Sequence, residues 1–300
     1  MGAGRREDLR TSITVAIPTY GRSASLLRAL RSLAEQSFPL ARFEVLVVDD
    51  GSMDDTRAVF SSWAKTAVGV RARLVSQPNR GLNAARNTAL AEAESDVVVM
   101  LDDDEEAPEG WLKHMVDALD RNPDAGCVGG PYFRRSPVPS PRTCANCSLD
   151  DGTVDLGPPE RLVSGVPGGN MAIRLWVVDQ TGGFDEQFSG GGDETEWLMR
   201  LTDAGVPIVF APDAWVWHHR SREQSTLRAI VVKLFRRGRE SSFVETAVGR
   251  PMSAGRELSR IPRLLAHSIR SRCWWGVVTS AWILGRVLGR RRPHRVSGQR

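Results

Sequence analysis

Short apolar runs alternate with amphipathic segments along the first half of the chain. Runs with the length of buried strands occupy 13–17 (ended by Pro18), 43–48 and 96–101, and Leu74 and Val75 end a third, short strand. Helical spacing of apolar residues is found at 23–38, in a stretch through Val59 and Trp63, and at 81–93. Ser23 is placed to cap the first helix. Near-continuous apolar strands joined by helices predict an α/β fold, with a mostly parallel sheet flanked by helices.

The pattern loosens after Pro131. The Pro- and Ser-rich stretch 136–142 predicts an exposed loop, and order returns at 164–174. Two more helices are expected, one near 176–181 and one that begins at about Glu194.

Charge divides the chain more sharply than its net value of +4 suggests. Residues 1–219 contain 21 Lys and Arg against 32 Asp and Glu, whereas residues 220–300 contain 19 against 4. We therefore expect three parts: a tail (1–12), an acidic main domain (13–220) and a basic helical C-terminal region (221–300).

The termini and cysteines indicate a cytoplasmic protein. The first ten residues lack the apolar stretch of a signal peptide, and Arg6 stands where a myristoylation motif needs Ser or Thr. Cys144 and Cys147 form one CxxC motif, but no second pair supports a zinc site. The expectation is an incidental thiol pair in a reducing compartment.

Five apolar residues, 97–101, run directly into five acids, 102–106. Asp49 and Asp50 also follow a predicted strand, so both acidic clusters should meet at the carboxyl edge of the sheet, where such folds bind ligands. If the chain stays extended, Asp102 and Asp104 point the same way and Asp103 points elsewhere. Two such carboxylates suit Mg²⁺ or Mn²⁺ carrying a diphosphate. The alternative is a solvated acidic loop.

Eight short motifs stand in a characteristic order. They are IPTYGR (17–22), VVDDGS (47–52), QPNRGLNAARN (77–87), LDDD (101–104), GGNMAIR (168–174), GGFDE (182–186), GGDETEW (191–197) and HH (218–219). The set resembles glycosyltransferase family 2, whose members have the GT-A fold, and the resemblance covers residues 13 to about 220. It implies an inverting enzyme that moves a sugar from a nucleotide-diphosphate sugar to an acceptor hydroxyl. It also implies that residues 13–220 form the catalytic domain, with a nucleotide-binding half (about 13–104) and an acceptor-side half (about 105–220).

The resemblance also implies roles for individual residues. Nucleotide-sugar binding falls on Pro18, Thr19, Asp49, Asp50, Arg86, Asp102, Asp103, Gly169 and Asn170. The metal ligands would be Asp104, Asp102 and His218. Arg86 would support either the nucleotide or the acidic cluster, with a plain surface arginine as the alternative. A tight glycine turn is the alternative for the Gly169 loop.

The family usually has Glu-Asp at the position of the general base, whereas this chain has Asp193-Glu194. Asp193 and Glu196 have the spacing of a capping box, which would make Asp193 the helix cap. Glu194 shares the face of Trp197 and Leu198, and Glu196 should lie on the opposite face with Arg200 and Asp203. We therefore expect Glu194 to be the base, with Asp193 as the alternative.

His218 and His219 end a late apolar strand, and alternation along that strand lets only one of them face the site. His218 is favoured, and a histidine packed at a strand end is the alternative. A nucleotidyltransferase would need a glycine-rich loop with a nearby lysine after the first strand, yet no lysine precedes Lys65. A receiver domain would leave the second acidic cluster and the GGDETEW helix without a purpose.

The segment 273–284 is uncharged and contains three tryptophans, but it is too short to cross a bilayer. With Arg290, Arg291 and Arg292 close by, it suggests peripheral attachment to the cytoplasmic membrane face. A helix packed on the body or joining a homodimer is the alternative. The acceptor would be a sugar, lipid-linked sugar or small molecule, as in envelope polysaccharide or glycolipid synthesis or natural-product tailoring. No nucleic-acid partner is expected.

Overall fold

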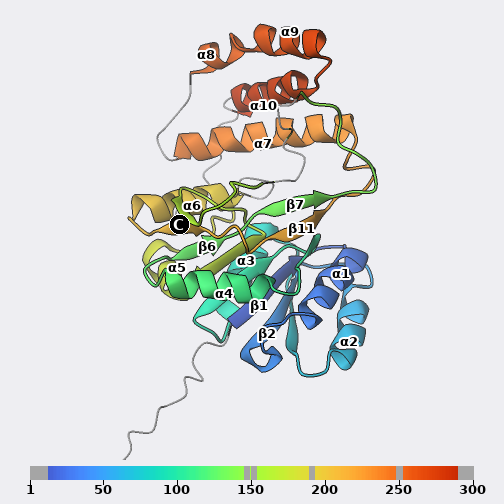
Figure 1. The fold of residues 1–300 in the computed structure, drawn as a ribbon, viewed down its shortest axis with the longest axis vertical. Helices are drawn as coiled ribbons and strands as arrows, with labels where there is room; N and C mark the ends of the chain where they lie inside the picture. The colour runs from blue at the N-terminus through green and yellow to red at the C-terminus, as the bar shows by residue number, and fades with distance from the viewer. Residues whose placement is uncertain (1–12, 145–148, 150–153, 189–192, 248–252, 290–300) are drawn as a thin grey trace, which may run out of the picture. The chain divides into compact units, whose positions relative to one another are not determined.

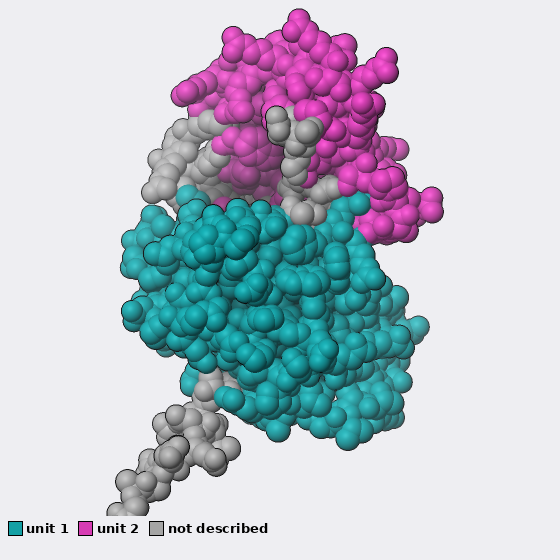
Figure 2. All heavy atoms as spheres, in the orientation of Figure 1, with its two compact units in different colours: residues 1–135, 153–189, 197–219 teal, residues 136–152, 190–196, 220–300 magenta. Residues whose placement is uncertain are grey.

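A computed structural model describes residues 13–144, 149, 154–188, 193–247 and 253–289. The predicted tail at 1–12 lies outside the described residues. The chain forms two compact units, coloured separately in Figure 2. The first unit comprises residues 1–135, 153–189 and 197–219, and the second comprises 136–152, 190–196 and 220–300. The domain boundaries expected from the sequence remain predictions.

The first unit is built on an eight-stranded sheet (Figure 1). The strands are, in spatial order, β3 (Arg71–Ser76), β2 (Phe43–Asp49), β1 (Ile13–Thr19), β4 (Val97–Leu101), β9 (Asn170–Arg174), β6 (Cys127–Gly129), β10 (Ile208–Phe210) and β8 (Arg161–Val163). The first four run parallel, β9 is antiparallel to β4 and β6, and β10 runs parallel to β6 and antiparallel to β8. The predicted mostly parallel sheet is confirmed.

Helices cover both faces of this sheet. One core joins a face of the sheet to α1 (Ser23–Ala34), α2 (Thr56–Thr66) and α4 (Trp111–Arg121). The other core joins the opposite face to α3 (Leu82–Glu92), α5 (Leu175–Thr181) and α6 (Asp193–Asp203). Because both faces are buried, the central strands are apolar at nearly every position, as the sequence indicated.

Two local predictions were wrong. Pro18 does not end β1 but pairs in register with Val48. The proline is tolerated because β1 pairs with β4 only over residues 13–16, so no ladder hydrogen bond on that side is lost. Ser23 does not cap α1 with its side chain. Instead its backbone N–H donates to Asp54 Oδ2 at 2.9 Å, so a carboxylate from a distant segment supplies the missing acceptor.

A second, three-stranded sheet extends the acidic end of β4. Its strands are β5 (Glu105–Glu106), β11 (Val216–His219) and β7 (Tyr132–Arg135), in the order β5-β11-β7. In the antiparallel pair of β5 and β11, His218 lies opposite Glu105. This register brings the histidine pair to the acids that follow β4. The remaining short element of the first unit is a 3₁₀ turn, η1 (Leu40–Arg42).

The second unit contains helices α7 (Leu227–Ala247), α8 (Ala254–Leu258), α9 (Ile261–Ser271) and α10 (Trp275–Gly289). α7 and α10 come unusually close. A Cβ atom at Gly238 would lie 2.1 Å from the Trp282 carbonyl oxygen, and one at Gly285 would lie 2.0 Å from that of Phe235. Much of the apolar α10 segment is thus covered within its own unit. Among the described residues, none of the helices combines the length and hydropathy required to span a bilayer. Arg290, Arg291 and Arg292 lie outside the described residues.

Candidate active site

The acids after β4 lie in a tight turn. The Glu105 N–H donates to the Asp102 carbonyl oxygen at 3.0 Å, and the Asp102 N–H donates back to Glu105 Oε2 at 3.3 Å. The expectation that Asp102 and Asp104 share a direction along an extended strand was therefore wrong. The turn places Asp103 and Asp104 together on one cation instead.

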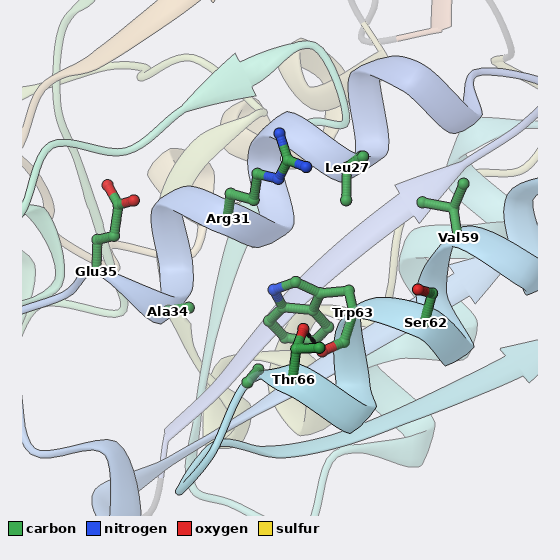
Figure 3. Close-up of a pocket in the computed structure, with 9 residues that line it drawn as sticks. Leu27, Arg31, Ala34, Glu35, Val59, Ser62, Trp63 and Thr66 are labelled. Atoms are coloured by element: carbon green, nitrogen blue, oxygen red, sulfur yellow. Dashed lines mark hydrogen bonds between the residues drawn. The ribbon is translucent and has the colours of Figure 1, made fainter.

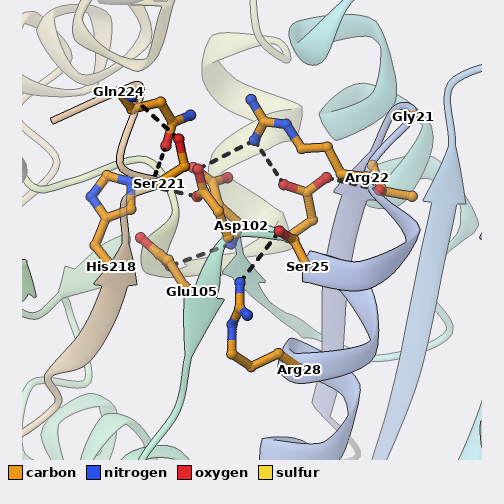
Figure 4. A network of polar contacts seen from close by, with 12 residues as sticks. Gly21, Arg22, Ser25, Arg28, Asp102, Glu105, His218, Ser221 and Gln224 are labelled. Carbon is orange, nitrogen blue, oxygen red and sulfur yellow. Dashed lines mark hydrogen bonds and ion pairs between the residues drawn. The ribbon is translucent and has the colours of Figure 1, made fainter. Parts of the chain in front are cut away.

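That cation is Arg22, from the turn after β1 (Figure 4). Its Nη1 lies 3.0 Å from Asp103 Oδ1 and 3.2 Å from Asp104 Oδ2. Asp103 also accepts a 2.8 Å hydrogen bond from the Thr19 hydroxyl. Thr19 is buried, so in this structure its hydroxyl orients the acidic turn.

Burial raises the pKa of two of these acids. Loss of solvent raises the pKa of Asp103 to about 6, although Arg22 acts in the opposite direction. Burial, and then the charges of Asp102 and Asp104, raise the pKa of Glu105 well above its usual value. A shift in this direction favours the neutral form of Glu105, which reduces the repulsion within the turn.

Asp102 is held from two sides. Arg86 Nη2, on α3, lies 3.5 Å from Asp102 Oδ1, and its guanidinium stacks over the ring of Phe184. Arg86 is buried, so the alternative of a plain surface arginine was wrong, and its contact is with the acidic cluster. On the other side, a Cβ atom at Gly169 would lie 2.5 Å from Asp102 Cγ. Only glycine allows the backbone of residue 169 to lie this close to the carboxylate.

The two histidines take different partners. His218 is buried, and its Nε2 lies 3.4 Å from Asp104 Oδ1, while its ring packs edge-on against Tyr132. His219 Nε2 instead lies 2.7 Å from Glu106 Oε2. Burial lowers the pKa of His219, followed by the charge of Arg28. Of the pair, His218 is thus the histidine whose side chain contacts an aspartate of the acidic turn, and it is the one favoured from the sequence.

Asp49 and Asp50 shape the loops beside the acidic turn. Asp50 accepts hydrogen bonds from the side chain of Gln77 (2.7 Å) and from the N–H groups of Arg80 (2.9 Å) and Gly81 (2.8 Å). Asp49 accepts from the Ser52 N–H at 2.8 Å. Asp50 is buried and thereby fixes the 77–81 loop and the start of α3.

Asn170 lies inside the first unit rather than at its surface. Its Oδ1 accepts a 2.8 Å bond from Trp111 Nε1, and its Nδ2 donates to the carbonyl oxygens of Pro131 (3.0 Å) and Ala214 (2.8 Å). It is fully buried, so in this structure its amide joins three segments around β9. Its predicted contact with the donor sugar is not tested by this arrangement.

Helix α6 carries the two candidate bases. Glu194 is half-buried in its first turn, and Trp197 and Leu198 are buried as predicted. Glu196 is also buried, so its placement on an exposed face was wrong. The side chain of Asp193 lies outside the described residues, and the capping box stays a prediction.

The donor atoms at the acidic turn fit a divalent cation. Asp104 Oδ1 and His218 Nε2 are 3.4 Å apart, which places a carboxylate and an imidazole where they can share a proton or a metal ion. Mg²⁺ and Mn²⁺ commonly use few protein ligands and complete their shell with substrate phosphates and water.

A groove of the first unit lies away from these residues. It is formed between α1 and α2 and is shown in Figure 3. Its lining is Leu27, Arg31, Ala34, Glu35, Val59, Ser62, Trp63, Thr66 and Ala67. No residue of the acidic turn belongs to it, so we assign it no part in the chemistry.

Comparison with known proteins identifies the family. The model of Glycosyl transferase family 2 matches residues 14–146. Glycosyltransferase AglE of Haloferax volcanii is 28% identical over 201 residues, covering 67% of this chain and 64% of that protein. Residues 14–146 are thus a glycosyltransferase family 2 domain. Of the motifs that carried the resemblance, IPTYGR, LDDD and HH supply side chains that meet at the acidic turn.

Two further relatives extend the comparison. Validoxylamine A glucosyltransferase of Streptomyces hygroscopicus subsp. jinggangensis is 29% identical over 243 residues, covering 70% of this chain and 57% of that protein. The chain thus spans about three fifths of the length of these two curated glycosyltransferases. The mannosyltransferase PcManGT from Pyrobaculum calidifontis, solved in complex with GDP-Man and Mn²⁺, matches with a TM-score of 0.70 at 19% identity. That match covers 94% of this chain and 88% of PcManGT and confirms the GT-A fold.

The sequence analysis missed Arg22 and Glu105 as site residues. Both were visible: Arg22 ends the IPTYGR motif, and Glu105 directly follows the three aspartates. Counting the charges at the end of this strand would have pointed to both residues. Several adjacent carboxyl groups at a buried strand end require a nearby cation and a raised pKa on at least one of them.

The raised pKa of Asp103 predicts a pH-dependent stability difference. The folded chain holds this proton more tightly than the unfolded chain, whose pKa is near 3.8, so ionisation lowers the free energy of unfolding as the pH rises from about 4 to 6. Asp103→Asn removes this cost. We expect the variant to gain on the wild type by about 2–3 kcal/mol between pH 4 and 7.

Urea unfolding at several pH values measures this difference. Asp117→Asn, which alters an acid on the outer side of α4, is the control and should run parallel to the wild type. A constant offset between Asp103→Asn and the wild type across this pH range would contradict the assignment.

Proposed function

We propose that this chain is an inverting glycosyltransferase that moves a sugar from a nucleoside-diphosphate sugar to an acceptor hydroxyl. The observation that carries the proposal is the turn 102–105, where buried acids at the carboxyl end of β4 meet Arg22, Arg86 and His218. Such an arrangement is suited to a metal-bound diphosphate at the edge of an α/β sheet.

In this proposal Asp104 and His218 hold Mg²⁺ or Mn²⁺, with Asp102 as a further ligand or as a partner of the ribose. The bound cation would stabilise the negative charge that develops on the diphosphate leaving group. The complex of PcManGT with GDP-Man and Mn²⁺ supports this choice of donor class and metal. Asp49, Asp50, Thr19 and Pro18 would border the nucleotide through the loops that they shape.

We propose that Glu194 is the general base that accepts the proton of the acceptor hydroxyl, with Asp193 as the alternative. A carboxylate in the first turn of α6 takes the proton of the acceptor hydroxyl as the oxygen attacks the anomeric carbon. The bond from that carbon to the diphosphate breaks in the same step, and the configuration inverts. No covalent link to the enzyme is formed.

Removing one carboxylate of the turn tests the donor site. Asp104→Asn should abolish donor turnover and weaken metal-dependent nucleotide binding while the fold survives, because an amide is a poor ligand for a hard cation. A panel of UDP-, GDP- and dTDP-sugars with Mn²⁺, read by thermal shift and by donor hydrolysis, measures both effects. Asp117→Asn is the matched control. Full activity of the wild type in excess EDTA would contradict the metal-dependent mechanism.

The base assignment has its own test. Glu194→Gln should slow transfer by about a hundredfold or more and leave donor affinity nearly unchanged, because the proton is taken only during transfer. Glu196→Gln, two residues along the same helix, is the comparison. If Asp193→Asn were far more damaging than Glu194→Gln at equal stability, the base would be Asp193.

We propose a lipid-linked or envelope glycan as the acceptor. A small-molecule acceptor is the second candidate, and the similarity to validoxylamine A glucosyltransferase favours it. The first candidate calls for contact with the cytoplasmic face of a membrane. An outer surface of α7 supports such contact, since a groove there is lined by Arg228, Lys233 and Arg236 beside the exposed Val232.

Liposome sedimentation tests the membrane contact. The wild type should bind anionic vesicles, lose this binding at high salt, and not bind neutral vesicles. The reason is that each basic residue near anionic lipid contributes about 1 kcal/mol of binding free energy. Arg228→Glu with Arg236→Glu should abolish binding, whereas Arg31→Glu with Lys65→Glu, an equal change of charge, should not. Equal binding of both double variants would exclude this surface. Failure of all forms to bind would favour a soluble acceptor or a homodimer.

A further inference from the structure

Three potential metal ligands from distant parts of the sequence meet inside the second unit. They are Cys144, on the segment that follows β7, His267 on α9, and Cys273 between α9 and α10. Their ligand atoms all lie within 4.8 Å of one another, and Cys144 Sγ is 3.3 Å from His267 Nε2. Among the residues that the structure describes, it is the one group of three or more His, Cys, Asp or Glu side chains whose ligand atoms lie this close together.

The spacing matches tetrahedral zinc. Zinc–sulfur bonds of about 2.3 Å and zinc–nitrogen bonds of about 2.0 Å place neighbouring ligand atoms about 3.5–3.8 Å apart. The observed Cys144–His267 separation is within a few tenths of an ångström of that range, and the 4.8 Å limit for the set needs only side-chain rotation to close. Two sulfurs and an imidazole nitrogen are also the ligand types that zinc prefers.

The surroundings support metal binding rather than simple packing. Cys273 is 2% exposed, yet its sulfur accepts a 3.2 Å hydrogen bond from the Cys144 N–H. Burial alone would raise the pKa of Cys273, but hydrogen bonds from the Cys144 and Trp275 N–H groups and from His267 outweigh it and lower the pKa to about 7. These donors favour the thiolate, the form that binds a metal. The ring of Trp275 lies edge-on to His267 and helps to orient it.

The backbone is also shaped for this meeting. Arg272, directly before Cys273, adopts a left-handed conformation (φ 46°) that ends α9 and turns the chain towards α10. The next residue, Trp274, donates its N–H to the Arg142 carbonyl oxygen at 3.0 Å, so the 142–144 segment runs beside the 273–274 corner. A non-glycine residue in this region is uncommon and indicates a locally determined geometry.

We propose that Cys144, His267 and Cys273 bind a structural zinc ion that fastens the 136–144 segment to helices α9 and α10. Binding releases the two thiol protons to solvent and involves no redox change. The site is separate from the proposed donor site in its ligands, since it uses sulfur and no carboxylate. Cys147 completes a CxxC motif with Cys144 in the sequence but lies outside the described residues, so the proposal rests on the other three side chains.

The CxxC motif was set aside in the sequence analysis because no second pair of cysteines accompanies it. The structure adds two potential ligands that a search for paired cysteines does not consider. His267 and Cys273 lie more than a hundred residues further along the chain, six positions apart across the end of a helix. No local spacing rule covers such a set.

The experiment measures zinc in the full chain. Protein purified without chelators should contain about one zinc per chain by mass spectrometry of the metal, and should bind cobalt in its place after exchange. Cobalt distinguishes the two kinds of site, because only thiolate ligands give the sulfur-to-cobalt charge-transfer band. Asp104→Asn should keep this band in full.

Cys144→Ser, His267→Ala and Cys273→Ser should each weaken zinc binding by about tenfold or more, and the two cysteine variants should reduce the charge-transfer band. Cys127→Ala and His114→Ala are the matched controls and should leave zinc content unchanged. Removal of zinc from the wild type should lower its melting temperature, whereas the same treatment of His267→Ala should have little effect.

Three results would overturn the proposal. One is a wild-type chain that binds neither zinc nor cobalt under reducing conditions. Another is a cobalt band that survives the loss of both Cys144 and Cys273. The third is a disulfide between these two residues in protein purified with a reducing agent. Because the first and third are measured on the wild type, the proposal stays testable even if a variant fails to fold.

Discussion

The constraint on which this structure depends is the neutralisation of four consecutive carboxyl groups at the end of a buried strand. β4 is fully buried, so the residues that follow it leave the interior at one point, and Asp103 and Glu105 are themselves buried. Buried carboxylates are costly unless they are paired or protonated. The chain uses both solutions: Arg22 pairs with two acids, Arg86 faces a third, and burial raises the pKa of Glu105, which favours its protonated form.

Much of the first unit serves to keep this turn in place. Thr19 at the end of β1 and Gly169 before β9 contact it from the neighbouring strands. Asp50 fixes the loop that leads into α3, the helix that carries Arg86. The buried amide of Asn170 ties β9 to two other segments, and the β5–β11 pair delivers His218. Strands from both sheets thus hold the acidic turn in its geometry.

The sequence was sufficient for the fold class and for the neighbourhood of the site. Continuous apolar strands predicted a sheet covered on both faces, and the carboxyl-edge rule placed the two acidic clusters together. It was insufficient for local geometry. Alternation along an extended strand was applied to Asp102–Asp104, where the chain in fact turns, and helix periodicity placed Glu196 on an exposed face although it is buried.

Contacts between residues far apart in the sequence could not be predicted, for a different reason. Arg22 lies some 80 residues from the acids that it neutralises, and Cys144 lies 123 residues from His267. Both pairs are brought together by tertiary folding. The local sequence around one partner therefore does not predict the other. The acidic cluster at least signalled that a cation was needed. The cysteines carried no such signal, because a single thiol is stable without any partner.

The central claim is that the acidic turn binds a divalent cation together with a nucleoside diphosphate. Electron paramagnetic resonance of Mn²⁺ measures it directly, since free and protein-bound ions differ in signal. We predict weak Mn²⁺ binding to the chain alone and binding about tenfold tighter once UDP or GDP is present, and the nucleotide should gain the same factor when Mn²⁺ is added. Mn²⁺ affinity that neither nucleotide changes would contradict the account.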